Sequence, residues 1–142
     1  MTVKKLIDAI AEALFQEFGS SYEIYTEKVE QGLTEPCFMI RFLNPTKNRY
    51  LGSVYKRTNL FVIQYIPSTS EANDECASVL ERLFECLKDV TLDGKPVHGT
   101  ELNGEVTDGI LNFKVNYDGF VMKKHDETNM EELEGILTEA KG

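Results

Sequence analysis

The stretch TNLFVIQYIP, residues 58–67, places the tightest limit on what this chain can fold into. In an extended backbone its apolar side chains fall on both faces, Leu60, Val62 and Ile66 on one, and Phe61, Ile63 and Tyr65 on the other. Strands that are apolar on both faces occur in the middle of a sheet. The sequence therefore predicts a central strand at 58–66, covered on both sides by helices or by another subunit.

Two amphipathic helices are predicted, one before this strand in the sequence and one after it. Apolar residues recur at steps of three and four in residues 3–18, which begin after a capping Thr2 and end before Gly19. A similar stripe predicts a second helix at about 70–88, capped from residues 68–70.

Four further strands follow from alternating apolar residues bounded by turn residues. They are predicted at 22–29, at 37–45 with Asn44-Pro45 as its end, at 100–109, and at 110–124 after a turn at Asp108-Gly109. The segment 89–99 carries an Asp93-Gly94 turn and predicts a hairpin-like excursion. The segment 46–57 is polar, basic and rich in tyrosine, and predicts a long loop or a projecting hairpin arm.

The predicted fold class is α+β, with a single mainly antiparallel sheet and two long helices packed on one face. A projecting basic loop or hairpin and a short C-terminal helix or tail complete it. The chain has 142 residues with 42% hydrophobic and 27% charged residues, which is typical of one globular domain. We expect a domain at 1–125 and an acidic tail at 126–142.

The start of the chain resembles a signal peptide, but Asp8, Glu12 and Glu17 interrupt its apolar run at helical intervals. No apolar run approaches the roughly 20 residues that span a bilayer. Three irregularly spaced cysteines, Cys37, Cys76 and Cys86, are expected to be reduced thiols of a cytosolic protein.

Charge is distributed unevenly along the chain. The formal net charge of −9 argues against a general nucleic-acid binder. No Asp or Glu occurs between Pro36 and Ser70, whereas residues 126–142 contain six acids and one base. The two segments either neutralise each other or meet different partners.

Catalytic and metal-binding patterns are absent from the sequence. The histidines, His98 and His125, lie in a turn and in the acidic tail, and no CxxC, HExxH, GxSxG or GxxxxGK[ST] pattern occurs. We expect a protein that is not an enzyme and that has no catalytic, cofactor-binding or metal-binding residues.

The basic arm is the strongest candidate for function, because arginine and tyrosine are favoured at protein interfaces. The alternative is a solvated loop whose charges matter only for solubility. The tail has an apolar stripe that packs on its own domain, reaches a neighbour or is disordered. The predicted interface residues are Arg41, Lys47, Arg49, Tyr50, Tyr55, Lys56, Arg57, Met130, Leu133, Ile136 and Leu137.

The order of several segments resembles the phage tail terminator (tail completion) proteins of Gram-positive phages, defective prophages and phage-tail-like bacteriocins. The resemblance spans roughly residues 2–123. It rests on LIDAIAEALFQEF, on YEIYTEKVEQGLTEPCFMIRFL, on NRYLGSVYKRTNLFVIQYIP, on the amphipathic helix after it and on LNFKVNYDGFVMKK.

The resemblance implies an α+β subunit of a hexameric ring at the head-proximal end of the tail tube. Such a ring stops tube polymerisation, anchors the last sheath ring of a contractile tail, and presents the surface that joins the head. The implied partners are further copies of the chain, the tube protein and, in contractile tails, the sheath protein. The implied location is the virion or tail-like particle, after assembly in the bacterial cytoplasm.

Within that ring, we expect the basic arm and the acidic tail to act as complementary patches on neighbouring subunits. Two other readings stay open. One is a neck, head-completion or baseplate structural protein, and the other is a cytosolic adaptor or small-molecule-binding α+β domain with an apolar pocket.

Overall fold

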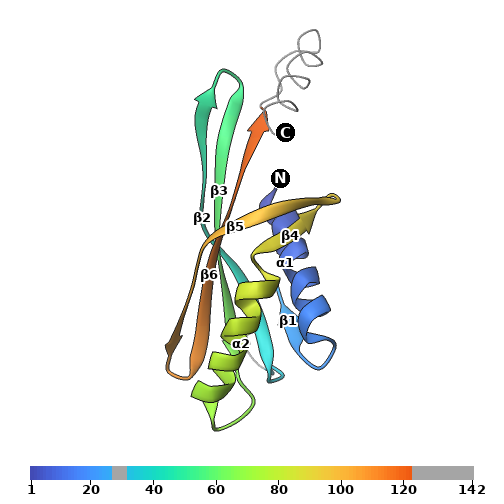
Figure 1. Ribbon diagram of the computed structural model, residues 1–142, viewed down its shortest axis with the longest axis vertical. Coiled ribbons are helices and arrows are strands. Elements are labelled where there is room, and N and C mark those ends of the chain that lie inside the picture. Colours follow the sequence, from blue (N-terminus) through green and yellow to red (C-terminus); the bar gives the residue numbers. More distant parts are fainter. Residues whose placement is uncertain (27–31, 123–142) are drawn as a thin grey trace.

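A computed structural model describes residues 1–26 and 32–122 of the chain (Figure 1). Its elements in order are α1 (Val3–Phe18), β1 (Glu23–Tyr25), β2 (Cys37–Leu51), β3 (Val54–Ile66), α2 (Ala72–Cys86), β4 (Asp89–Leu92), β5 (Lys95–Thr107) and β6 (Ile110–Met122). The predicted α+β class is confirmed.

The strands form one curled six-stranded sheet in the order β1-β2-β3-β6-β5-β4. β1 runs parallel to β2, and all other neighbours are antiparallel. β3 lies inside the sheet, as predicted, and pairs along its length with both β2 and β6.

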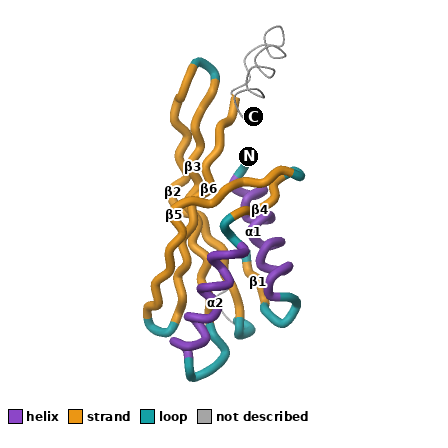
Figure 2. Tube along the Cα trace, in the orientation of Figure 1, coloured by secondary structure: helices purple, strands orange, loops and turns teal. Residues whose placement is uncertain are grey.

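Both helices lie on the same face of the sheet (Figure 2). We call this face the helix side and the opposite one the reverse face. The hydrophobic core fills the space between the helices and the sheet. Its fully buried members include Leu6, Ile10, Leu14, Phe38, Phe61, Ile63, Leu83, Leu87, Leu111, Phe113 and Val115.

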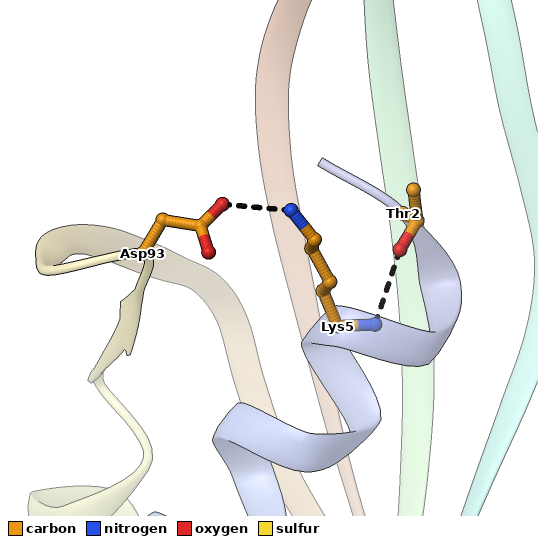
Figure 3. A network of polar contacts seen from close by, with 3 residues as sticks. All are labelled: Thr2, Lys5 and Asp93. Atoms are coloured by element: carbon orange, nitrogen blue, oxygen red, sulfur yellow. Dashed lines mark hydrogen bonds and ion pairs between the residues drawn. The ribbon is translucent and has the colours of Figure 1, made fainter.

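The start of α1 is fixed by a cap and by a contact with the β4–β5 turn (Figure 3). The Thr2 hydroxyl accepts a hydrogen bond from the Lys5 backbone N–H at 3.1 Å, as an N-cap does. The Lys5 ammonium lies 3.0 Å from the Asp93 carboxylate in the turn at Asp93-Gly94. The ion pair therefore joins the first turn of α1 to the β4–β5 hairpin, which forms one edge of the sheet.

The start of α2 differs from the prediction. Its N-cap is Glu71, which makes no side-chain cap hydrogen bond. Ser68 and Thr69 instead donate to the carboxylate of Glu75, at 2.9 and 2.7 Å. The Tyr65 hydroxyl donates to the same carboxylate, so the acid holds the end of β3 against α2.

β2 and β3 are longer than predicted, because the chain does not leave the sheet at Asn44-Pro45. Asn44 has a φ of 44°, and the ladder between β2 and β3 shifts register between Leu43 and Thr46. A β-bulge admits a proline without ending the strand. The predicted end of the strand at residue 45 is therefore wrong, and residues 46–51 continue it.

Two other predicted boundaries are also corrected. β1 occupies only Glu23–Tyr25, and residues 27–29 of the predicted strand 22–29 lie outside the described residues. The predicted excursion at 89–99 and the strand at 100–109 share one continuous strand, β5, which bends where Glu101 has a φ of 56° and the register shifts between Thr100 and Asn103.

Both helices lie on one face of the sheet, as the predicted fold class states, so no helix of the described residues covers the reverse face of β3. On the reverse face, Val62 and Met39 are buried, with 8% and 5% exposure. The Arg41 guanidinium lies 3.3 Å from the Met39 sulfur there. Coverage of this face by another subunit stays a prediction.

The described helices include none that is both long and apolar enough to cross a membrane. The short C-terminal helix predicted from Asn129 lies outside the described residues.

Candidate assembly interface

The predicted basic arm is a β-hairpin that projects past the helix layer (Figure 1). β2 and β3 pair as far as Leu51 and Val54 around a Gly52-Ser53 turn. The end of β6 joins them, because its ladder with β3 continues from Thr58↔Asp118 to Val54↔Met122. We define the arm as residues 46–58 together with 118–122, three strands wide.

The helix side of the arm carries a cluster of positive charge around one aromatic ring. Lys47 pairs across the ladder with Arg57, and Arg49 with Tyr55, so all four side chains share this face. The Lys47 ammonium and the Arg49 guanidinium each lie 5.2 Å from the centroid of the Tyr55 ring. Contacts of this length are cation–π interactions, which hold two exposed cations in place.

Two hydrogen bonds fix these cations further. Arg49 donates to the Gly52 carbonyl at the arm's turn, at 2.8 Å. Arg57 donates to the side-chain oxygen of Asn59 at 2.9 Å. Asn59 is itself 1% exposed and donates to the Tyr117 carbonyl at 3.0 Å, so the basic face is anchored in the core at the base of the arm.

The reverse face of the arm is mainly aromatic and aliphatic. Tyr50 and Phe120 meet there at a centroid distance of 4.9 Å in an edge-to-face arrangement. Tyr50 and Leu51 are exposed by 64% and 72%, more than the other large hydrophobic residues described. Lys56 lies on the same face, opposite Asn48 and Phe120 in the ladders.

The five bases of residues 36–70 form no ion pair with any acid in the described parts of the chain. The ion pairs of the described residues join Lys4 to Asp8, Lys5 to Asp93, Arg82 to Glu17 and Lys88 to Glu85, and the His98 ring contacts Asp89. The arm therefore presents positive charge that its own described domain does not neutralise.

The structure brings together six of the predicted interface residues and separates one. Arg41 lies on the reverse face of the sheet, below the arm and against Met39. The apolar tail residues Met130, Leu133, Ile136 and Leu137 lie outside the described residues. The six in the arm are Lys47, Arg49, Tyr50, Tyr55, Lys56 and Arg57.

Sequence reasoning missed Leu51 and Phe120 as surface residues of this region. The signal for Phe120 was present, because the strand pattern of 110–117 continues through DGFVM beyond the last core residue, Tyr117. When the apolar residues of a strand continue beyond the hydrophobic core, they form an exposed apolar surface, which is typical of an interaction site.

The strongly shifted titratable groups in the described residues serve the fold. Burial, followed by the hydrogen bond to Glu75, raises the pKa of Tyr65. Burial raises the pKa of Tyr117, whose hydroxyl donates to the Leu87 carbonyl at 2.6 Å. Both hydroxyls tie a strand of the sheet to one end of α2, and neither lies in the arm.

The cysteines and acids of the described residues show no sign of a metal centre. Cys37, Cys76 and Cys86 are free thiols, and burial raises the pKa of Cys86 to about 12. Residues 1–26 and 32–122 hold no group of three His, Cys, Asp or Glu side chains that could bind an ion. The arm remains the candidate site.

Three comparisons place the chain among known proteins. A protein-family model described as "Phage tail terminator protein" matches residues 5–129. No curated protein matches the chain. One solved structure is 11% identical, with 89% of this chain and 99% of that chain covered and a TM-score of 0.43, too low to carry an argument.

Proposed function

The chain belongs to the phage tail terminator protein family, and we propose that it forms a hexameric ring on the head-proximal end of the tail tube. The ring stops tube polymerisation. In a contractile tail it also anchors the last sheath ring, and in a phage with a head it presents the joining surface. Membership of the family by itself shows a structural component of a phage tail.

One observation carries this proposal beyond the family, namely the projecting arm with its unneutralised charge. A capping subunit needs a rigid body and a surface that reaches past it to a neighbour. The arm supplies that surface, because Lys47, Arg49 and Arg57 are held in place without an ion-pair partner among the described residues. Charged surfaces of this kind steer and orient binding.

We propose that this basic face contacts an acidic surface on the tube, the sheath or an adjacent subunit. The acidic tail of a neighbouring subunit is one such surface, and its apolar residues Met130, Leu133, Ile136 and Leu137 form a second proposed contact. Ring closure by rotation needs heterologous contacts, in which two different patches of the chain meet.

Tail length in particles that lack this protein tests the function. We expect deletion of its gene to give tubes of irregular, extended length in electron micrographs, and purified protein added to growing tubes to halt them. Tubes of normal length without the protein contradict the proposal.

Charge variants test the role of the arm. We expect Lys47→Gln with Arg49→Gln to weaken capping at least tenfold, because both variants keep much of the side-chain stem and lose the charge. The matched control is Lys95→Gln with Lys114→Gln, which removes two exposed charges outside the arm. Equal capping by the two double variants contradicts a role for the basic face.

A further inference from the structure

The arm is a three-stranded sheet with two open edges in the described structure. Its outer strand β2 pairs with β1 only from Cys37 to Met39, far below residues 46–51. On the other side, the ladder of β5 with β6 begins at Gly99↔Tyr117 and does not reach residues 118–122. No described strand therefore covers either edge.

Open edges present a row of unpaired N–H and C=O groups, which is a template for pairing with another strand. Folded proteins blunt such edges with bulges, prolines or charges. β2 carries a bulge and Pro45 below the arm and a second register shift between Arg49 and Leu51, so residues 46–49 pair regularly and contain no proline. The charges of this stretch, Lys47 and Arg49, are held over the Tyr55 ring on one face of the sheet. Residues 118–122 also contain no proline.

From these edges we infer that the arms of neighbouring copies join edge to edge, with residues 46–51 of one copy hydrogen-bonded to residues 118–122 of the next. This inference rests on the proposed ring. Both strands run toward the tip of the arm, since Leu51 and Met122 each lie beside Val54. Rotation about a ring axis keeps that sense, so the junction is a parallel pair.

A second copy fits these edges because one chain supplies both halves of the contact at the same end of the molecule. Two unlike edges on opposite sides of one arm are the arrangement that a closed head-to-tail ring requires. Three strands from each of six copies would give about 18 strands, a number at which β-barrels enclose an aqueous channel.

The positive charge of the arm does not oppose this junction. Lys47, Arg49 and Arg57 point to one face of the sheet and not across its edge. The nearest like charges across the junction, Arg57 of one copy and Lys47 of the next, lie two strand spacings apart, about 10 Å, which still exceeds the screening length of about 8 Å at physiological ionic strength.

Site-specific photo-cross-linking in purified tails tests the junction directly. The probe, p-benzoylphenylalanine, replaces Asn48, an exposed residue of the outer strand, and mixed ¹⁵N- and ¹⁴N-labelled protein identifies links between copies. We expect Asn48 to link to residues 118–122 of a different copy. The control position is Ser78 on the exposed face of α2, which should give no such link.

Other occupants of the edge would appear in the same experiment and overturn the inference. Links from position 48 to residues 123–142, to the tube protein or to nothing each mean that the edges do not meet. If rings are seen at tail ends but position 48 gives one of these other results, only the junction is wrong and the proposed function stands. If the protein is absent from tail ends, the proposed function has failed instead.

Proline substitution gives a second test that does not depend on a probe. N–H groups of consecutive strand residues point to opposite edges, so one of Lys47→Pro and Asn48→Pro removes an outward N–H and the other an N–H bonded to β3. The variant with the higher melting temperature is the outward one. We expect it to lower the fraction of ring at least tenfold.

The matched control for proline lies on β5, which has an open edge outside the arm. The better folded of Glu105→Pro and Val106→Pro should leave the ring fraction unchanged. A ring fraction that survives the outward arm proline, or that falls equally with the β5 proline, overturns the edge-to-edge junction.

Discussion

The rings of Tyr50 and Phe120 meet edge to face although a whole strand, β3, separates their own strands. The two rings pass over the reverse face of β3 and tie its outer neighbours β2 and β6 together. The arm therefore has its own aromatic contact, in addition to its ladders, to hold its three strands in one sheet.

A double-mutant cycle on this pair should show coupling. We expect Tyr50→Ala and Phe120→Ala to interact by about 0.5–1.5 kcal/mol in the free energy of unfolding, the usual range for an aromatic pair. Guanidinium titration of the four proteins measures it. The same cycle with Tyr50 and Phe15, an exposed aromatic residue of α1, should give no coupling. Additivity in the first cycle would show that the contact does not stabilise the arm.

Replacing Asn59 should loosen the base of the arm. Asn59→Leu removes the acceptor of Arg57 and a donor to the Tyr117 carbonyl, and an unsatisfied buried partner costs about 1–3 kcal/mol. We expect that loss in chemical unfolding, together with faster amide exchange in residues 54–58. Asn48→Leu is the control, because Asn48 is exposed in the same hairpin. Equal effects of both variants would contradict an anchoring role for Asn59.

The carboxylate of Glu75 should make stability depend on pH in the acid range. Partial burial opposes its ionisation, but hydrogen bonds from Tyr65, Thr69 and Ser68 prevail and lower its pKa. A lowered folded-state pKa adds stability that is present above the unfolded value of about 4.3 and is lost as the pH falls through the folded value.

The measurement is the melting temperature from pH 7 down to pH 3 for the natural protein and Glu75→Gln. We expect the variant to be less stable by about 1–2 kcal/mol at pH 7, and the difference to shrink below pH 4. Glu81→Gln, an exposed position of α2, should follow the natural protein throughout. A constant difference across the range would exclude Glu75 as the source.

Two glycines of β5 should differ in their tolerance of alanine. A Cβ at Gly99 would lie 2.8 Å from a Val115 methyl and 3.0 Å from the Leu87 carbonyl, which is backbone. A Cβ at Gly104 would lie 2.5 Å from the end of the Leu80 side chain, which can rotate. Overpacking costs about 1–3 kcal/mol, and we expect Gly99→Ala to lose more than Gly104→Ala. Thermal unfolding of both variants checks the order, and Leu80→Ala should rescue only Gly104→Ala.

Much of the fold could be predicted from local sequence patterns. The stripe of α1 and its Thr2 cap predict that helix, and the Asp93-Gly94 and Asp108-Gly109 turns lie where the sequence places them, with positive φ at each residue. The two-sided apolar pattern of residues 58–66 predicts an interior strand, which β3 is. These features depend on neighbours in sequence.

The position of the arm in the chain could be predicted from the sequence, but its strand structure and its two faces could not. Its bases and tyrosines resemble a loop, and Asn44-Pro45 resembles a stop, because single-residue propensities do not reveal a bulge that lets the strand continue. The division of the arm into a basic face and an aromatic face depends on register with β3 and β6, which only long-range pairing fixes. The parallel pairing of β1 has the same origin.

The three strands of the arm are the same three that cross the hydrophobic core, and no loop interrupts β3 or β6 between them. A load applied at the tip is thus carried along continuous strands into the hydrophobic core. The arm is therefore anchored at its base in the core, and we expect it to bend less than a loop attached through flexible residues.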